Sequence, residues 1–119
     1  MEFKENLPIY IQIINYIKKD MVVGDIEPGE KLPSTRELSK SLTVNPNTIQ
    51  RAYRELEGQS LVYTRRGSGT FATEDEEMIK NLKKDIAKDL VGNFLKGMRS
   101  LNFNKADIKE MIDNYIEED

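Results

Sequence analysis

The sequence predicts a mostly α-helical chain with a small β-wing and a two-helix C-terminal tail. Three observations support this fold class: apolar residues recur at helical spacing along most of the chain, two helix-start signals lie close together near its middle, and a glycine-containing turn then separates two short apolar runs. We place one domain at residues 1–73 and a helical region at residues 74–119.

The first helix is expected to begin near Pro8, because the fixed φ of proline suits a helix start. Its apolar stripe has helical spacing and consists of Tyr10, Ile13, Ile14, Ile17 and Met21. The segment Val23–Gly29 lacks this periodicity and contains two glycines and a proline, so the helix is expected to end there in a loop.

The first helix-start signal after this loop is a capping box. The Ser34 hydroxyl is placed to accept the backbone N–H of Glu37, and the glutamate carboxylate to accept that of Ser34. We therefore expect a short second helix that begins at Ser34 and buries Leu38 and Leu42.

The second signal is Asn45 followed by Pro46, which supplies an N-cap and a first-turn proline. A third helix is predicted from there to about Gln59. Its apolar stripe consists of Ile49, Ala52, Tyr53 and Leu56. Two helices joined by so tight a turn are typical of a helix-turn-helix, whose later helix can enter a groove of DNA.

A wing is predicted directly after the third helix. Residues 61–64 and 70–73 have the composition of strands, and residues 65–69 have that of a turn. The hairpin completes a winged helix-turn-helix domain.

The tail begins after four acidic residues at positions 74–77. A long amphipathic helix is predicted from the apolar residues Ile79, Leu82, Ile86, Leu90, Phe94, Met98 and Leu101. Gly92 and Gly97 each weaken a helix by ~1 kcal/mol relative to alanine, unless close helix packing or a kink requires these glycines, so the sequence allows a break near Gly97. Asn104 is expected to cap a last helix, whose apolar face consists of Ile108, Met111, Ile112, Tyr115 and Ile116.

Composition argues against most enzyme classes. The chain has no cysteine and no histidine, which removes thiolate ligands, cysteine nucleophiles and the commonest general base. We predict no catalytic, metal or cofactor site. No run approaches the ~20 apolar residues of a membrane span, and the acidic N-terminus is unlike a signal peptide, so a cytoplasmic protein is expected.

The charge is unevenly distributed along the chain. Residues 34–73 contain six basic and three acidic residues, a net charge of +3, whereas residues 74–119 contain eight basic and twelve acidic residues, a net charge of −4. A locally basic domain favours double-stranded DNA as the partner.

Four ordered motifs carry a resemblance to a known family. They are Pro8–Ile13, Pro28–Leu38, Val44–Thr48 and Arg66–Phe71, and together they resemble the N-terminal domain of GntR-type regulators. The short two-helix tail resembles that of the YtrA-type subfamily. The resemblance implies DNA binding as a homodimer, with repression of a neighbouring operon; whether a small-molecule effector is sensed stays open.

The predicted DNA-binding residues lie in three places. At the start of the second helix they are Ser34 and Arg36. At the start and along the third helix they are Asn45, Asn47, Thr48, Gln50, Arg51 and Arg54, and in the wing turn they are Arg65, Arg66, Gly67 and Gly69. Arginine is suited to phosphate or guanine, and Arg65 or Arg66 is suited to the minor groove. Simpler readings stay open: Asn45 as a cap alone, Arg36 and Arg54 as solvated charges, and the two glycines as turn residues alone.

The sequence departs from the family pattern at two positions. Many members carry arginine where Pro46 and Gln50 stand here, and those arginines often contact guanine. Glutamine matches adenine, so we expect an operator richer in A·T pairs.

The tail is predicted to form a dimer interface, because a monomer of this size has difficulty covering its apolar faces. The interface residues are Ile79, Leu82, Ile86, Leu90, Phe94, Met98, Ile108, Met111, Ile112 and Tyr115. Two alternatives stay open: the tail packs on its own domain, or the winged domain binds a protein instead of DNA.

Overall fold

The computed structural model describes residues 1–119 and contains five helices and one two-stranded antiparallel sheet. The predicted mostly α fold with a β-wing is confirmed. The chain divides into two compact units, Met1–Lys83 and Lys84–Asp119. Their boundary lies inside α4 (Glu76–Ser100), so the first part of this helix belongs to the first unit. The domain boundary that we placed at residue 73 stays a prediction.

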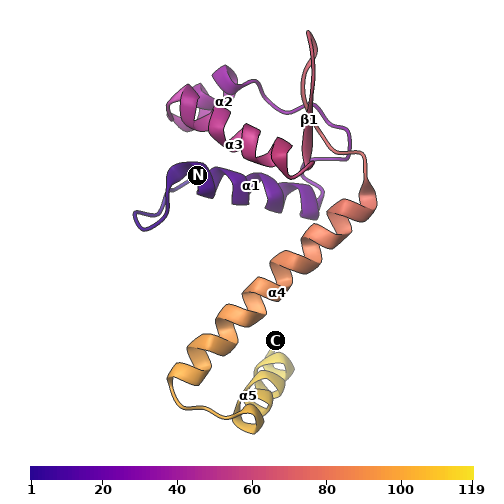
Figure 1. Cartoon of the computed structure of the whole chain (residues 1–119). Helices are drawn as coiled ribbons and strands as arrows, with labels where there is room; N and C mark the ends of the chain where they lie inside the picture. Colours follow the sequence, from indigo (N-terminus) through magenta and orange to yellow (C-terminus); the bar gives the residue numbers. More distant parts are fainter. The chain divides into compact units, whose positions relative to one another are not determined.

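The core of the first unit lies between α1 (Ile9–Val23) and α3 (Pro46–Gly58), which pack side by side (Figure 1). Most residues of the two predicted stripes are buried, namely Ile13, Ile14, Ile17, Met21, Ile49, Ala52, Tyr53 and Leu56. Tyr10 is only half-buried. Burying a large apolar side chain contributes about 1.5–3 kcal/mol, so this interface holds α3 in place.

The helix ends follow the local signals. Gly24 ends α1 in the left-handed conformation with φ 88°. The capping box of α2 (Thr35–Leu42) is present: the Ser34 hydroxyl accepts from the Glu37 N–H at 3.0 Å, and Glu37 Oε1 accepts from the Ser34 N–H at 3.1 Å. Leu38 and Leu42 are half-buried rather than buried, because α2 lies at the edge of the core.

The wing consists of β1 (Val62–Arg65) and β2 (Gly69–Ala72). Both strands are displaced by one residue from the predicted ranges. The antiparallel register pairs Val62 with Ala72 and Arg65 with Gly69. Val62 and Ala72 are buried, which fixes the base of the hairpin in the core.

The second unit contains the remainder of α4 and α5 (Lys105–Glu118). The predicted cap of α5 is confirmed, because the Asn104 side chain accepts from the Asp107 N–H at 2.9 Å. The break that the sequence allows near Gly97 does not occur: α4 continues to Ser100, and the chain turns at Asn102, which has φ 67°. Close packing does not require either glycine of α4, because a Cβ at Gly92 or Gly97 would meet nothing within 4 Å. None of the five helices combines the length and apolar composition that a bilayer span requires.

Candidate nucleic-acid interface

One hollow of the first unit brings together the start of α2, the middle of α3 and both strands of the wing. Its lining residues are Thr35, Gln50, Tyr53, Arg54, Glu57, Thr64 and Thr70. Three elements separated in sequence therefore present polar side chains to the same space.

Arg36 lies in the first turn of α2 and is exposed. The adjacent backbone is fixed from two sides: the capping box holds Ser34, and the hydroxyl of Tyr53 donates to the Pro33 carbonyl at 2.7 Å. The hydrogen bonds with Ser34, the backbone one first, hold the pKa of Glu37 below its ordinary value. The Ser34 hydroxyl has accepted one bond and keeps its own hydrogen as a donor.

The start of α3 offers side chains rather than free amides. The Asn45 side chain accepts from the Asn47 N–H at 2.8 Å, and the Asn45 carbonyl accepts from Thr48 at 3.0 Å and from Ile49 at 3.4 Å. Pro46 has no N–H to donate. The cap function of Asn45 is therefore confirmed, and the exposed side chain of Asn47 is the free group at this helix end.

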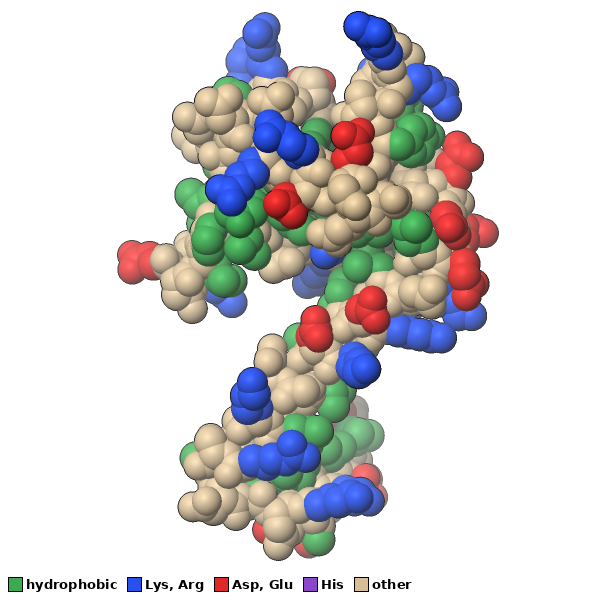
Figure 2. All heavy atoms as spheres, viewed as in Figure 1, with side chains coloured by type: hydrophobic (Ala, Val, Ile, Leu, Met, Phe, Trp, Pro, Cys, Tyr) green, Lys and Arg blue, Asp and Glu red, His purple; other side chains and the backbone are tan.

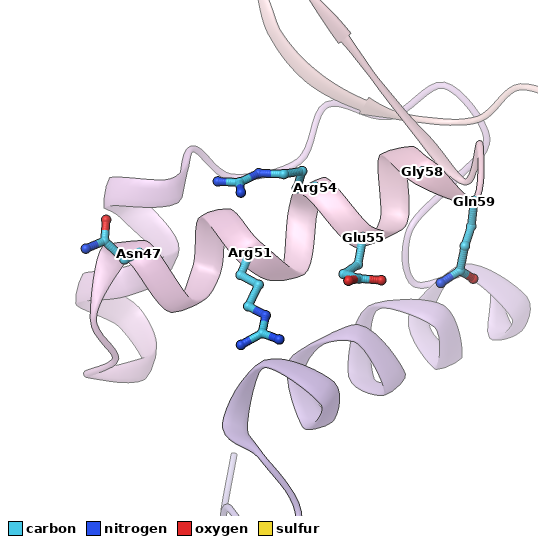
Figure 3. Close-up of a pocket in the computed structure, with 6 residues that line it drawn as sticks. All are labelled: Asn47, Arg51, Arg54, Glu55, Gly58 and Gln59. Carbon is cyan, nitrogen blue, oxygen red and sulfur yellow. The ribbon is translucent and has the colours of Figure 1, made fainter.

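The two arginines of α3 differ in their surroundings. Figure 3 shows Arg51 and Arg54 leaving α3 on opposite sides, with Arg51 directed toward α1. The Arg51 guanidinium lies 3.7 Å from the centroid of the Tyr10 ring, a cation–π contact. Arg54 borders both the hollow described above and a second one, whereas Arg51 borders only the second, which Asn47 also lines. Arg54 is the better placed of the two to reach a ligand on the outer surface of α3.

The two arginines of the wing also differ. The Arg65 guanidinium lies 5.8 Å from the Tyr63 ring centroid and 5.4 Å from that of Phe71. Arg66 is exposed in the turn next to Gly67, which has φ 80° and therefore suits glycine. Figure 2 shows Lys and Arg side chains gathered at the free end of the hairpin and over the α2–α3 surface.

The structure adds one basic residue that we did not predict for the site, Lys31. It pairs with Phe71 of β2 in an isolated bridge, and its side chain passes over Gly69. Residue 31 lies outside both the helix patterns and the wing pattern, so periodicity carried no signal for it.

The predicted tail interface residues differ in exposure, and three of them, Ile86, Met98 and Ile112, are half-buried. Leu82 and Ile108 are buried and Ile79 is half-buried within their own units. Those that remain strongly exposed are Leu90, Phe94, Met111 and Tyr115. Val91, Leu101 and Ile116 are exposed as well and were not predicted for the interface. Between α4 and α5 lies an almost wholly apolar hollow lined by Phe94, Met98, Met111, Ile112, Tyr115 and Ile116.

Residues 9–72 match the family described as bacterial regulatory proteins, gntR family. The chain belongs to this family. It is 40% identical over 116 residues to the HTH-type transcriptional regulator YhcF of Bacillus subtilis (strain 168), covering 98% of this chain and 96% of that protein. It is 44% identical over 72 residues to the HTH-type transcriptional repressor YtrA of the same organism, covering 60% of this chain and 55% of that protein.

Solved structures of this gntR family agree with the fold. The GntR family transcriptional regulator from Listeria monocytogenes superimposes with a TM-score of 0.87 at 47% identity, covering 94% of this chain and 98% of that one. AraR(DBD) in complex with operator ORR3 superimposes with a TM-score of 0.55 at 36% identity, covering 61% of this chain and 86% of that one. The resemblance inferred from the four motifs is confirmed, and the chain is a transcriptional regulator with a DNA-binding winged helix-turn-helix.

Proposed function

We propose that the chain is a repressor that binds a pseudo-palindromic DNA operator as a homodimer. The main support for a DNA-binding surface is the hollow shared by α2, α3 and the wing. This hollow places Gln50 and Arg54 beside the start of α2, the helix that contains Arg36. Repression is supported by the relative YtrA, which is named a transcriptional repressor. The operator complex of AraR(DBD) supports the use of the same domain on DNA.

In the proposed complex, α3 enters the major groove and its side chains contact base edges. Asn47 and Gln50 are exposed and match adenine geometrically, whereas Arg36 and Arg54 supply the cationic contacts. Arg51 stabilises the α1–α3 pair through Tyr10 and reaches DNA only if that contact is released. The turn of the wing carries Arg66 to the adjacent minor groove.

The homodimer is proposed to form through the second unit. Leu90 is 66% exposed, Tyr115 is 78% exposed and Ile116 is 66% exposed, and Phe94 lies beside the apolar hollow. A contiguous exposed apolar surface of this kind is typical of an interface. Two domains related by a two-fold axis would contact half-sites whose centres lie about one helical turn of ~10 bp, or a multiple of it, apart.

Selection of bound duplexes from a random pool tests the DNA-binding proposal and yields the sequence, symmetry and spacing of the operator. Arg36→Ala is then expected to lose most of its operator affinity with little change in melting temperature, because Arg36 is exposed. Arg99→Ala, an exposed arginine of α4, is the matched control. Unchanged affinity in Arg36→Ala would remove this residue from the site.

The competing function is a winged domain that binds a protein partner. Salt dependence separates the two, because DNA binding weakens steeply with salt through counterion release, whereas an apolar protein contact does not. A pool that yields no enriched sequence, together with salt-insensitive binding to a protein, would favour the competing function.

The dimer is tested by sedimentation equilibrium of Phe94→Glu, which places a charge at the apolar hollow. We expect a monomer, because a buried unpaired carboxylate at the interface is strongly unfavourable. Asn93→Glu changes the exposed neighbouring residue and is expected to stay dimeric. A dimeric Phe94→Glu protein would place the interface elsewhere.

A further inference from the structure

Residues 30–32 lie against the outer edge of β2 and pair with it in an isolated antiparallel bridge at Lys31. The Leu32 N–H donates to the Thr70 carbonyl at 2.8 Å, and the Ala72 N–H donates to the Glu30 carbonyl at 2.8 Å. β2 is therefore hydrogen-bonded along both edges, and the segment before α2 is fixed to the hairpin by backbone hydrogen bonds.

This pairing places two cations on one face of the wing. Lys31 lies opposite Phe71, and Phe71 lies opposite Tyr63, so these three side chains share a face. The two rings stack with centroids 5.6 Å apart. Arg65 pairs with Gly69 on the same face, and its guanidinium lies within cation–π distance of both rings.

Gly69 makes room for the Lys31 side chain. A Cβ at position 69 would lie 2.7 Å from Lys31 Cε, which is closer than real Cβ contacts allow, and the φ of Gly69 is 131°. The aliphatic part of Lys31 therefore crosses the strand at Gly69, the residue that pairs with Arg65. The side chains of Lys31 and Arg65 are both exposed, so neither charge is strongly desolvated.

The cationic face is distinct from the base-reading hollow. Successive side chains of a strand point to opposite faces, and the other face carries Thr64 and Thr70, which line the hollow with α3. Lys31 also lies near the start of α2: after the hydrogen bonds with Ser34, its charge helps to lower the pKa of Glu37. Lys31 thus lies between the wing and the helix that carries Arg36.

We propose that Lys31 and Arg65 bind adjacent backbone phosphates of DNA, one each, on the strand that borders the minor groove entered by Arg66. An ammonium and a guanidinium on one face provide several charge-assisted donors for phosphate oxygens. Arg65 is held by the two rings, whereas Arg66 has no ring contact and is free to enter the groove. The inference rests on the proposed function and adds Lys31 to its DNA contacts.

Lys31→Met tests this inference, because methionine keeps an apolar stem over Gly69 and removes the charge. The slope of log affinity against log salt concentration is negative. In a homodimer, the loss of one phosphate contact per subunit should make this slope shallower by about 1.8. The affinity loss should then be about tenfold larger near 50 mM than near 200 mM salt. It should be equal on the selected operator and on a scrambled duplex, since phosphate contacts carry no base information.

Two further variants complete the experiment. Lys31→Arg should keep the wild-type slope, and Lys80→Met, which removes an exposed lysine of α4, should also keep it. Lys31→Gln also removes the charge but leaves a polar side chain. Thermal unfolding of both variants then shows whether methionine alone disturbs the fold. Wild-type slopes in both Lys31→Met and Lys31→Gln would overturn the inference, as would a loss confined to the operator. Absence of salt-dependent binding in the wild-type protein would instead contradict the proposed function.

Discussion

The hydroxyl of Tyr53 in α3 donates a 2.7 Å hydrogen bond to the carbonyl of Pro33, the residue just before the N-cap of α2. Tyr53 is only 7% exposed and its backbone belongs to the core helix. This bond ties the start of α2, and with it Arg36, to the helix that is proposed to read bases. The relative position of the two helices therefore depends in part on a buried side chain that was not predicted for the DNA-binding site.

Tyr53→Phe should weaken both stability and operator binding. Removal of the hydroxyl leaves the Pro33 carbonyl without this partner, which costs about 1 kcal/mol of unfolding free energy. Urea denaturation measures that loss, and Tyr16→Phe at a 47% exposed tyrosine is the matched control. If the bond acts through Arg36, Tyr53→Phe should reduce affinity in the wild-type background and have no further effect in Arg36→Ala. Equal effects in both backgrounds would show that Tyr53 does not position Arg36.

Tyr53 should also make the protein sensitive to alkaline pH. Burial first, and then the negative charge of Glu37, raise the pKa of Tyr53 from 10.0 to about 12. Between these values the unfolded chain has lost a phenolic proton that the folded chain retains. The contribution to stability is therefore complete below pH 10 and is lost as the pH rises toward 12. Unfolding free energies measured across this range should fall less steeply in Tyr53→Phe; identical slopes would contradict the assignment.

The helices were predictable because their signals are local. The pair Ser34 and Glu37, the pair Asn45 and Pro46, and the cap at Asn104 each act within a few residues, and all are present in the structure. Core positions of α1 and α3 followed from their periodicity in the same way.

The surroundings of the candidate site were not predictable to the same extent, because they depend on contacts between distant residues. An isolated bridge pairs Lys31 with Phe71 across a whole helix-turn-helix, and no local pattern indicates that pairing. The contact between Arg51 and Tyr10 distinguishes Arg51 from Arg54, although both have the same residue type and lie on one helix. Sequence reasoning therefore identified the arginines but not Lys31, and only the fold shows which arginines contact aromatic rings and which do not.

Thr43→Gly should stabilise the protein. Thr43 ends α2 in the left-handed region with φ 55°, a conformation that costs an L-residue roughly 1–2 kcal/mol. Glycine relieves this strain, although the greater freedom of the unfolded chain offsets part of the gain. We expect a net increase of about 0.5–1 kcal/mol in unfolding free energy by urea denaturation. Ser41→Gly, inside α2, should instead destabilise by about 0.5 kcal/mol, and a matching loss in Thr43→Gly would show that residue 43 is unstrained.

The point at which the chain is truncated should decide whether the isolated winged domain is stable. Leu82 is 9% exposed and belongs to the first unit, and Ile79 borders a hollow with Met21 of α1. A protein ending at Lys83 keeps these side chains, whereas one ending at Thr73 loses them. Burial of a leucine contributes about 1.5–3 kcal/mol, so the shorter protein should unfold at clearly lower urea concentration.

Both truncated proteins lack the proposed dimer surface. They should sediment as monomers and bind a two-half-site operator far more weakly than the full chain, because the second half-site contact is no longer coupled to the first. Leu82→Ala in the full chain is the control: it should lower stability while the protein stays dimeric. Equal stability of the two truncated proteins would show that α4 contributes nothing to the first unit, and a dimer of the protein ending at Lys83 would place the interface within the winged domain.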